Sequence, residues 1–131
     1  EIAQCLVGSE MCIRDRCVDN DETASVVARL VHAKTLLILT SADGIYRDPA
    51  DPSTIVRELS AKEPAALEAA VRELQKSCVG ASRQGAGGAF AKLNYILPCA
   101  LSGTHVVIGS PRFHLRELLE GSVPATHIYL A

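Results

Sequence analysis

The order of apolar and polar positions along the chain predicts strands that alternate with helices. Residues 35–40 form a continuous apolar run that ends at Thr40, and residues 104–108 form a second run of the same kind. A run without alternation is typical of a strand that is covered on both faces, as in a parallel sheet. Shorter stretches at 55–59 and 126–130 are further strand candidates. We therefore expect a sheet of mainly parallel strands.

Helical spacing of apolar residues marks the segments between these strands. Residues 21–34 place apolar side chains on one face, and residues 63–77 repeat the spacing in a more polar helix. A third helix is expected from residue 88 or 89 to 102, with Pro98 kinking or splitting it. A short helix follows at 112–120. The expected apolar face of the first helix consists of Ala24, Val27, Ala28 and Val31.

Glycines follow the last two of these helices at the positions where helices commonly end. Gly103 and Gly121 can both adopt the left-handed conformation that closes a helix. Strands joined by helices form crossover units, whose helices cover the faces of one sheet. The pattern therefore predicts the α/β class.

The composition fits one soluble domain, or part of one. The chain has 131 residues, of which 48% are hydrophobic and 4% aromatic, and its formal net charge is −2. Such a charge does not favour nucleic acid or an anionic membrane as a partner. The five cysteines include no closely spaced pair, and the four histidines lack metal-ligand spacing. We therefore expect a cytoplasmic protein without a disulfide framework or a metal site of its own.

The first sixteen residues differ in character from the rest. Residues 1–16 resemble the translation of a sequencing adapter, and a short native strand with a loop is the alternative. If the segment is foreign, the native sequence begins at residue 17 and is truncated at its N-terminus. Residues 17–131 are then the native domain.

Short polar side chains stand where the first helix should begin. Asp19, Asn20 and Asp21 precede its apolar pattern, and Asp19 or Asn20 could accept hydrogen bonds from the free amides of the first turn. A helix cap is the simplest interpretation. Two carboxylates and an amide at one point could equally form part of a site.

A glycine-rich stretch opens the third helix. Residues 85–88 read Gly-Ala-Gly-Gly, and Lys92 follows one helical turn later. The start of a helix offers unpaired amides to an anion, and glycine allows its close approach. Thr40 and Ser41 end the first strand, on the side of a parallel sheet where ligands collect. A flexible connection with a surface lysine is the alternative.

The order of these motifs resembles the amino acid kinase family. The order runs from Asp-Asn-Asp through a helix and an apolar strand ending in Thr to residues 43–46 (Asp-Gly-Ile-Tyr), then to Gly-x-Gly-Gly-x-x-x-Lys. Within the family it is most similar to the glutamate kinases of proline biosynthesis, and Ala125-Thr126 matches a terminal Gly-Thr step. The resemblance implies a three-layer αβα sandwich, with residues 17–131 as the nucleotide-binding C-terminal half of a kinase domain.

The resemblance also implies a role for each matching residue. Asn20, with Asp19, would contact the amino-acid substrate, and Asp21 would organise catalytic lysines. Lys92 would neutralise charge as the γ-phosphoryl group of ATP moves, with Mg²⁺ beside it. The implied nucleotide-binding residues are Thr40, Ser41, Gly44, Tyr46, Gly85, Ala86, Gly87, Gly88 and Lys92.

Several positions depart from the family pattern, and they leave alternatives open. Ser41 replaces an Asp and Ala86 replaces a Thr. The resemblance implies phosphorylation of the γ-carboxylate of L-glutamate by a homo-oligomeric parent protein. The alternatives are a family member with another acceptor, such as uridylate or aspartate, and a non-catalytic nucleotide-binding homologue. Because the first lysine and most of the acceptor site of the family lie upstream, we expect this chain to be inactive alone.

Overall fold

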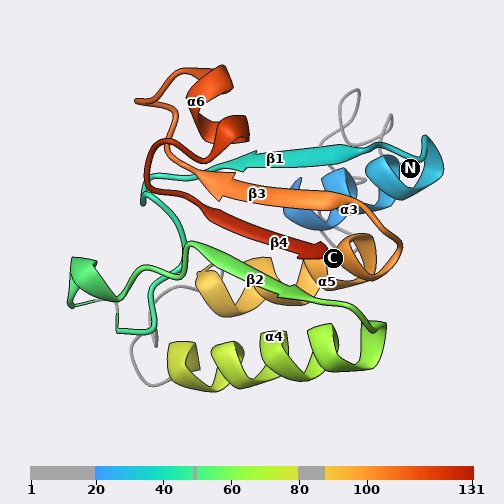
Figure 1. Ribbon diagram of the computed structural model, residues 1–131, viewed down its shortest axis with the longest axis horizontal. Helices are drawn as coiled ribbons and strands as arrows, with labels where there is room; N and C mark the ends of the chain where they lie inside the picture. Colours follow the sequence, from blue (N-terminus) through green and yellow to red (C-terminus); the bar gives the residue numbers. More distant parts are fainter. Residues whose placement is uncertain (1–19, 49, 80–87) are drawn as a thin grey trace, which may run out of the picture.

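One sheet of four strands organises the computed structural model, which describes residues 20–48, 50–79 and 88–131. The strands stand in the order β1-β3-β4-β2 (Figure 1). Parallel pairing joins β1 to β3 and β2 to β4, whereas β3 and β4 are antiparallel. The predicted α/β class with a mainly parallel sheet is confirmed. The strands are β1 (Thr35–Leu39), β2 (Glu58–Ala61), β3 (His105–Gly109) and β4 (Thr126–Leu130).

Three helices cover one face of this sheet, and a shorter helix packs on the other. α5 lies between α3 and α4, and alternate residues of β3 face the two layers. Val106 and Ile108 join the main core with α4 and α5, whereas Val107 packs against Leu118 of α6. These layers give the expected αβα arrangement. The helices are α3 (Asn20–Leu30), α4 (Pro64–Val79), α5 (Ala89–Leu101) and α6 (Leu115–Glu120), with a 3₁₀ turn η1 (Pro52–Thr54).

The strands differ from the prediction in position and in cover. β1 was expected to be a strand covered on both faces, yet it lies at the edge of the sheet, and Leu39 is 52% exposed. Thr40 stands just beyond the strand, and its N–H donates to the carbonyl of Gly109 at 2.8 Å. The extended piece expected at 55–59 is displaced: β2 covers Glu58–Ala61, whereas Ile55 bridges Tyr46.

The first helix was predicted too long. α3 ends at Leu30 instead of residue 34, and His32 adopts a left-handed backbone with φ 53°. Contacts from outside the helix hold this turn. The N–H of Ala33 donates to the carbonyl of Ala28, and the hydroxyl of Thr104 donates to the carbonyl of Ala33. The second contact joins residues 71 positions apart, so periodicity cannot reveal it.

The buried face of α3 also differs from the predicted one. Ala28 of the predicted face is buried at 5% exposure, as expected, but Val27 and Val31 are 50% and 66% exposed, and Ser25, outside that face, is buried at 3%. α3 packs closely against α5, and small side chains at this contact let the two helices approach. Packing against α5 therefore buries the small residues of α3, and the larger Val27 and Val31 are exposed to solvent.

The ends of the later helices follow the prediction in part. α5 passes through Pro98 as one helix, so the expected split is wrong. The expected stops at Gly103 and Gly121 are confirmed, because these residues follow α5 and α6 with φ of 102° and 78°. α6 begins at Leu115 instead of residue 112, which leaves Arg112 in a loop. No helix in the described ranges is long and apolar enough to cross a membrane.

Candidate functional site

Two of the residues singled out in the sequence meet in an ion pair. The Nζ atom of Lys92 lies 2.8 Å from Oδ2 of Asp21, although the residues are 71 positions apart. Asp21 stands in the first turn of α3 and Lys92 in the first turn of α5, and the packing of these helices brings them together. Their side chains are only 17% and 19% exposed. The pair is therefore shielded from much of the solvent that screens surface ion pairs.

The start of α5 lies at the end of the sheet where β1 and β3 terminate. In Figure 1 the arrowheads of β1 and β3 lie at the same end as the beginning of this helix. Gly88 occupies the N-cap position without a side-chain cap. The first-turn amides of α5 thus lack a side-chain acceptor at the cap, which is the arrangement that suits an anion.

The segment after β1, residues 41–48, is an ordered loop held by β4. The N–H of Ile45 donates to Oγ1 of Thr126 at 2.8 Å, and both residues are buried. Gly44 lies directly against this contact, because a Cβ atom placed on it would stand 2.5 Å from Oγ1 of Thr126. A side chain at position 44 would therefore force the loop away from β4.

The far side of the same loop is closed by a short turn. Tyr46 bridges Ile55, and the N–H of Val56 donates to the carbonyl of Ile45 at 2.8 Å. Asp51 caps the 3₁₀ turn between them, and hydrogen bonds from the hydroxyl and the N–H of Ser53 hold the pKa of its carboxyl below the ordinary value. The segment after β1 is thus hydrogen-bonded on both flanks.

A second ion pair joins the loops that follow β1 and β3. The guanidinium of Arg112 contacts both carboxylate oxygens of Asp43, with Nε to Oδ1 at 3.1 Å and the terminal nitrogen to Oδ2 at 2.6 Å. The same guanidinium lies 4.4 Å from the ring centre of Phe113. Sequence patterns do not reveal this pair, because its residues lie 69 positions apart and Arg112 falls within the helix predicted at 112–120. A two-pronged contact of this kind sets the spacing of the two loops.

The other candidate residues are placed as follows. Asn20 is exposed at the first position of α3, and Ser41 is exposed beyond β1. Thr40 and Tyr46 are partly buried, and Gly44 is buried. Four expected site residues lie outside the described residues: Asp19, Gly85, Ala86 and Gly87.

A protein-bound metal ion would need a cluster of ligands. Within the described ranges, no group of three or more His, Cys, Asp or Glu side chains could hold one. Magnesium ions that act on nucleotides usually take their ligands from phosphates, water and one or two carboxylates. An ion of that kind needs no cluster of three protein ligands.

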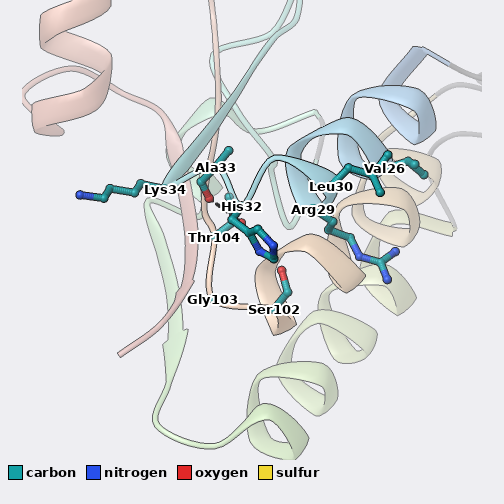
Figure 2. A pocket seen from close by; sticks show the side chains of 9 residues that line it. All are labelled: Val26, Arg29, Leu30, His32, Ala33, Lys34, Ser102, Gly103 and Thr104. Atoms are coloured by element: carbon teal, nitrogen blue, oxygen red, sulfur yellow. Dashed lines mark hydrogen bonds between the residues drawn. The ribbon is translucent and has the colours of Figure 1, made fainter.

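A cavity lined by described residues lies at the opposite end of the sheet. It has a volume of about 610 Å³ and sits where α3 and α5 end and β1 and β3 begin. The carbonyl end of α5 carries partial negative charge, which disfavours a phosphate there. The opposite end of α5, beside Asp21 and Lys92, is the end of this helix that suits an anion. Figure 2 shows the residues that line the cavity: Val26, Arg29, Leu30, His32, Ala33, Lys34, Ser102, Gly103 and Thr104.

Comparison with known proteins identifies the family. The family model "Amino acid kinase family" matches residues 10–110, most of the chain. The chain belongs to the amino acid kinase family. The match begins inside the segment that resembles an adapter, so the boundary at residue 16 stays a prediction.

Individual relatives of this amino acid kinase include several glutamate kinases. The glutamate 5-kinase of Nostoc punctiforme is 31% identical over 113 residues, and that of Methylobacillus flagellatus is 36% identical over 118 residues. These alignments cover 83% and 84% of the chain. The [LysW]-aminoadipate kinase of Deinococcus radiodurans is 35% identical over 72 residues, which cover 54% of the chain and 25% of that relative. The chain spans 29% of the length of both glutamate 5-kinases.

Proposed function

We propose that the complete protein is an ATP-dependent kinase that phosphorylates the γ-carboxylate of L-glutamate, the first step of proline biosynthesis, in the cytoplasm. The family assignment supports a phosphotransferase, and the glutamate 5-kinases among its relatives support this acceptor. The observation that carries the proposal is the partly buried contact of Lys92 with Asp21 at the start of α5. It holds an ammonium beside the helix end that suits a phosphate.

The proposed reaction joins a carboxylate oxygen of glutamate to the γ-phosphorus of ATP. The bond from that phosphorus to the oxygen bridging the β- and γ-phosphates breaks, and ADP leaves. Such a transfer needs mainly alignment and charge compensation. Mg²⁺, which comes with ATP, supplies positive charge at the phosphates.

In this proposal, residues of the chain stabilise charge and bind the phosphates, the nucleotide and the amino-acid substrate. Lys92 supports the negative charge of the moving phosphoryl group, and Asp21 keeps its ammonium in place. The first-turn amides of α5 and residues 85–88 receive the phosphates, and Thr40 to Tyr46 line the nucleotide. Asn20, with Asp19, contacts the amino-acid substrate.

The acceptor is the least constrained part of the proposal. The relative named [LysW]-aminoadipate kinase favours a second candidate, in which the acceptor is an aminoadipate-like acid with one more methylene than glutamate. Both candidates use a side-chain carboxylate and the same nucleotide chemistry. The acceptor pocket distinguishes them, so the substrate must be tested directly.

The test is an acyl-phosphate assay on the complete protein with ATP and Mg²⁺. Each acid is offered in turn (L-glutamate, L-2-aminoadipate and L-aspartate), and the product is trapped with hydroxylamine. We expect turnover with L-glutamate, and a loss of about 10²- to 10³-fold in kcat for Lys92→Met, as for removal of other charge-stabilising groups. Lys76→Met is the matched control, because that side chain is 76% exposed at the surface of α4.

Each contrary result has a separate meaning. Full activity of Lys92→Met would contradict the role of this lysine. Tight ATP binding without turnover on any acid would indicate a non-catalytic homologue, as Ser41 and Ala86 leave open. The 131-residue chain alone should form no acyl phosphate, and measurable turnover by it would refute that expectation.

A further inference from the structure

Thr126 is buried beneath the loop that follows β1, and the proposed chemistry gives it no task. It is the first residue of β4 and is fully buried. Its position is fixed by the sheet, because it pairs with Ile108 of β3. Its Oγ1 atom accepts the N–H of Ile45 at 2.8 Å, across 81 positions of sequence. A rigid strand thus holds one point of a loop.

Both backbone groups of Ile45 are used in such contacts. Its N–H is bonded to Thr126 and its carbonyl accepts the N–H of Val56, while its side chain is 2% exposed. Gly44 lets the loop approach closely enough for the first contact. Ile45, whose N–H donates to the Thr126 hydroxyl, therefore stands between Gly44 and Tyr46, the two loop residues expected to line the nucleotide.

We propose that Thr126 is a positioning residue for the nucleotide, whose hydroxyl holds the loop after β1 in the conformation that receives ATP. The inference rests on the proposed function, which supplies the ligand of this loop. Thr126 does not touch the nucleotide in this proposal. It acts through the Ile45 amide, which is buried and would lose its partner if the hydroxyl were removed.

The decisive variant is Thr126→Val, which keeps the branched shape and removes the acceptor. Thr126→Ser restores the acceptor and is the rescue variant. The matched control is Thr104→Val, because Thr104 is also buried at 3% exposure, and its hydroxyl donates to Ala33 at the other end of the sheet. Each variant is made in the complete protein, so that loop and activity are measured in the same molecule.

Two measurements are needed. Amide hydrogen exchange reports on residues 42–48, and steady-state kinetics give the KM for ATP and kcat separately. In Thr126→Val we expect exchange at Ile45 to rise about tenfold or more, since loss of a buried hydrogen-bond partner is worth about this factor. We expect the KM for ATP to rise about tenfold with kcat within a few-fold, because binding and not the chemical step is impaired. Thr126→Ser should restore both values, and Thr104→Val should change neither.

The outcomes separate this inference from the function on which it rests. If exchange at Ile45 rises but the KM for ATP does not, the positioning role is wrong while the kinase assignment stands. If Thr104→Val raises the KM as much as Thr126→Val, the effect is general destabilisation, and the inference also fails. If the unaltered protein neither binds nor turns over ATP, the proposed function fails first and the inference with it.

Discussion

The contact between Asp21 and Lys92 can be tested through stability, without any assay of activity. Asp21→Asn keeps the volume of the side chain and removes its charge, and Lys92→Met keeps most of the length of the lysine. Either change leaves a charged partner in a place that is less than a fifth exposed. The two single variants and the double variant form a thermodynamic cycle that isolates the interaction.

The expected size lies between two known limits. Exposed ion pairs contribute about 0.2–1 kcal/mol, whereas removing one partner of a fully buried pair costs about 3–5 kcal/mol. Because both side chains retain a small exposed fraction, we expect a coupling free energy of about 2 kcal/mol. Asp21→Asn also removes a negative charge from the first turn of α3, which costs about 0.3–1 kcal/mol by itself. The cycle subtracts that second effect.

The assay is equilibrium unfolding in urea, with the free energy of unfolding extrapolated to water. The control cycle uses Glu73→Gln and Lys76→Met on α4, a pair at 3.3 Å whose side chains are 71% and 76% exposed. We expect its coupling to be below about 0.5 kcal/mol, as for other helical surface pairs. A coupling for Asp21 and Lys92 no larger than this control would refute the reasoning, since burial would then add nothing.

Other predictions concern the core, a helix end and pH. Leu93→Ala should lower the free energy of unfolding by about 2–5 kcal/mol, because Leu93 is fully buried, while Leu115→Ala at a site 60% exposed should change it by less than about 0.5 kcal/mol in the same urea assay. Gly121→Ala should cost about 1–2 kcal/mol and lower the thermal midpoint, because φ is 78° there. Burial lowers the pKa of His105 and of His127 below 6.5, so both side chains favour the neutral form in the folded protein. Repulsion from His105 lowers the pKa of His127 further. The contribution of these two residues to the free energy of unfolding should therefore be complete above pH 6.5 and be lost as the pH drops through the lowered pKa values. In the double variant His105→Gln and His127→Gln, the urea midpoint should depend less on pH over this range.

The predicted elements agree with the structure where local chemistry decides them. The apolar runs at 35–40 and 104–108 correspond to β1 and β3, and the helix ends at Gly103 and Gly121 are correct. Consecutive apolar residues mark strands of this kind, and a glycine that tolerates positive φ marks helix ends of this kind. Both features lie within a few positions of sequence.

The errors arise where a distant partner decides. Val27 and Val31 share the periodicity of a buried helix face but are exposed, whereas Ser25 is buried on α3, which packs against α5. Likewise, β1 has the composition of a central strand but lies at the edge. Apolar character shows that a side chain can be buried. Which side chains are buried depends on the helix or strand that packs against them.

The candidate site divides in the same way. From the sequence alone, the kinds of residues are known: a carboxylate at one helix start, a glycine-rich stretch and a lysine at another, and a polar strand end. The tertiary structure decides that Lys92 reaches Asp21, that Arg112 joins Asp43, and that Thr126 holds Ile45. These contacts span 69 to 81 positions, because the sheet order places segments side by side that are distant in the chain. Sequence by itself determined which chemical groups the chain carries, and the packing of its helices and strands decided which of those groups lie in contact.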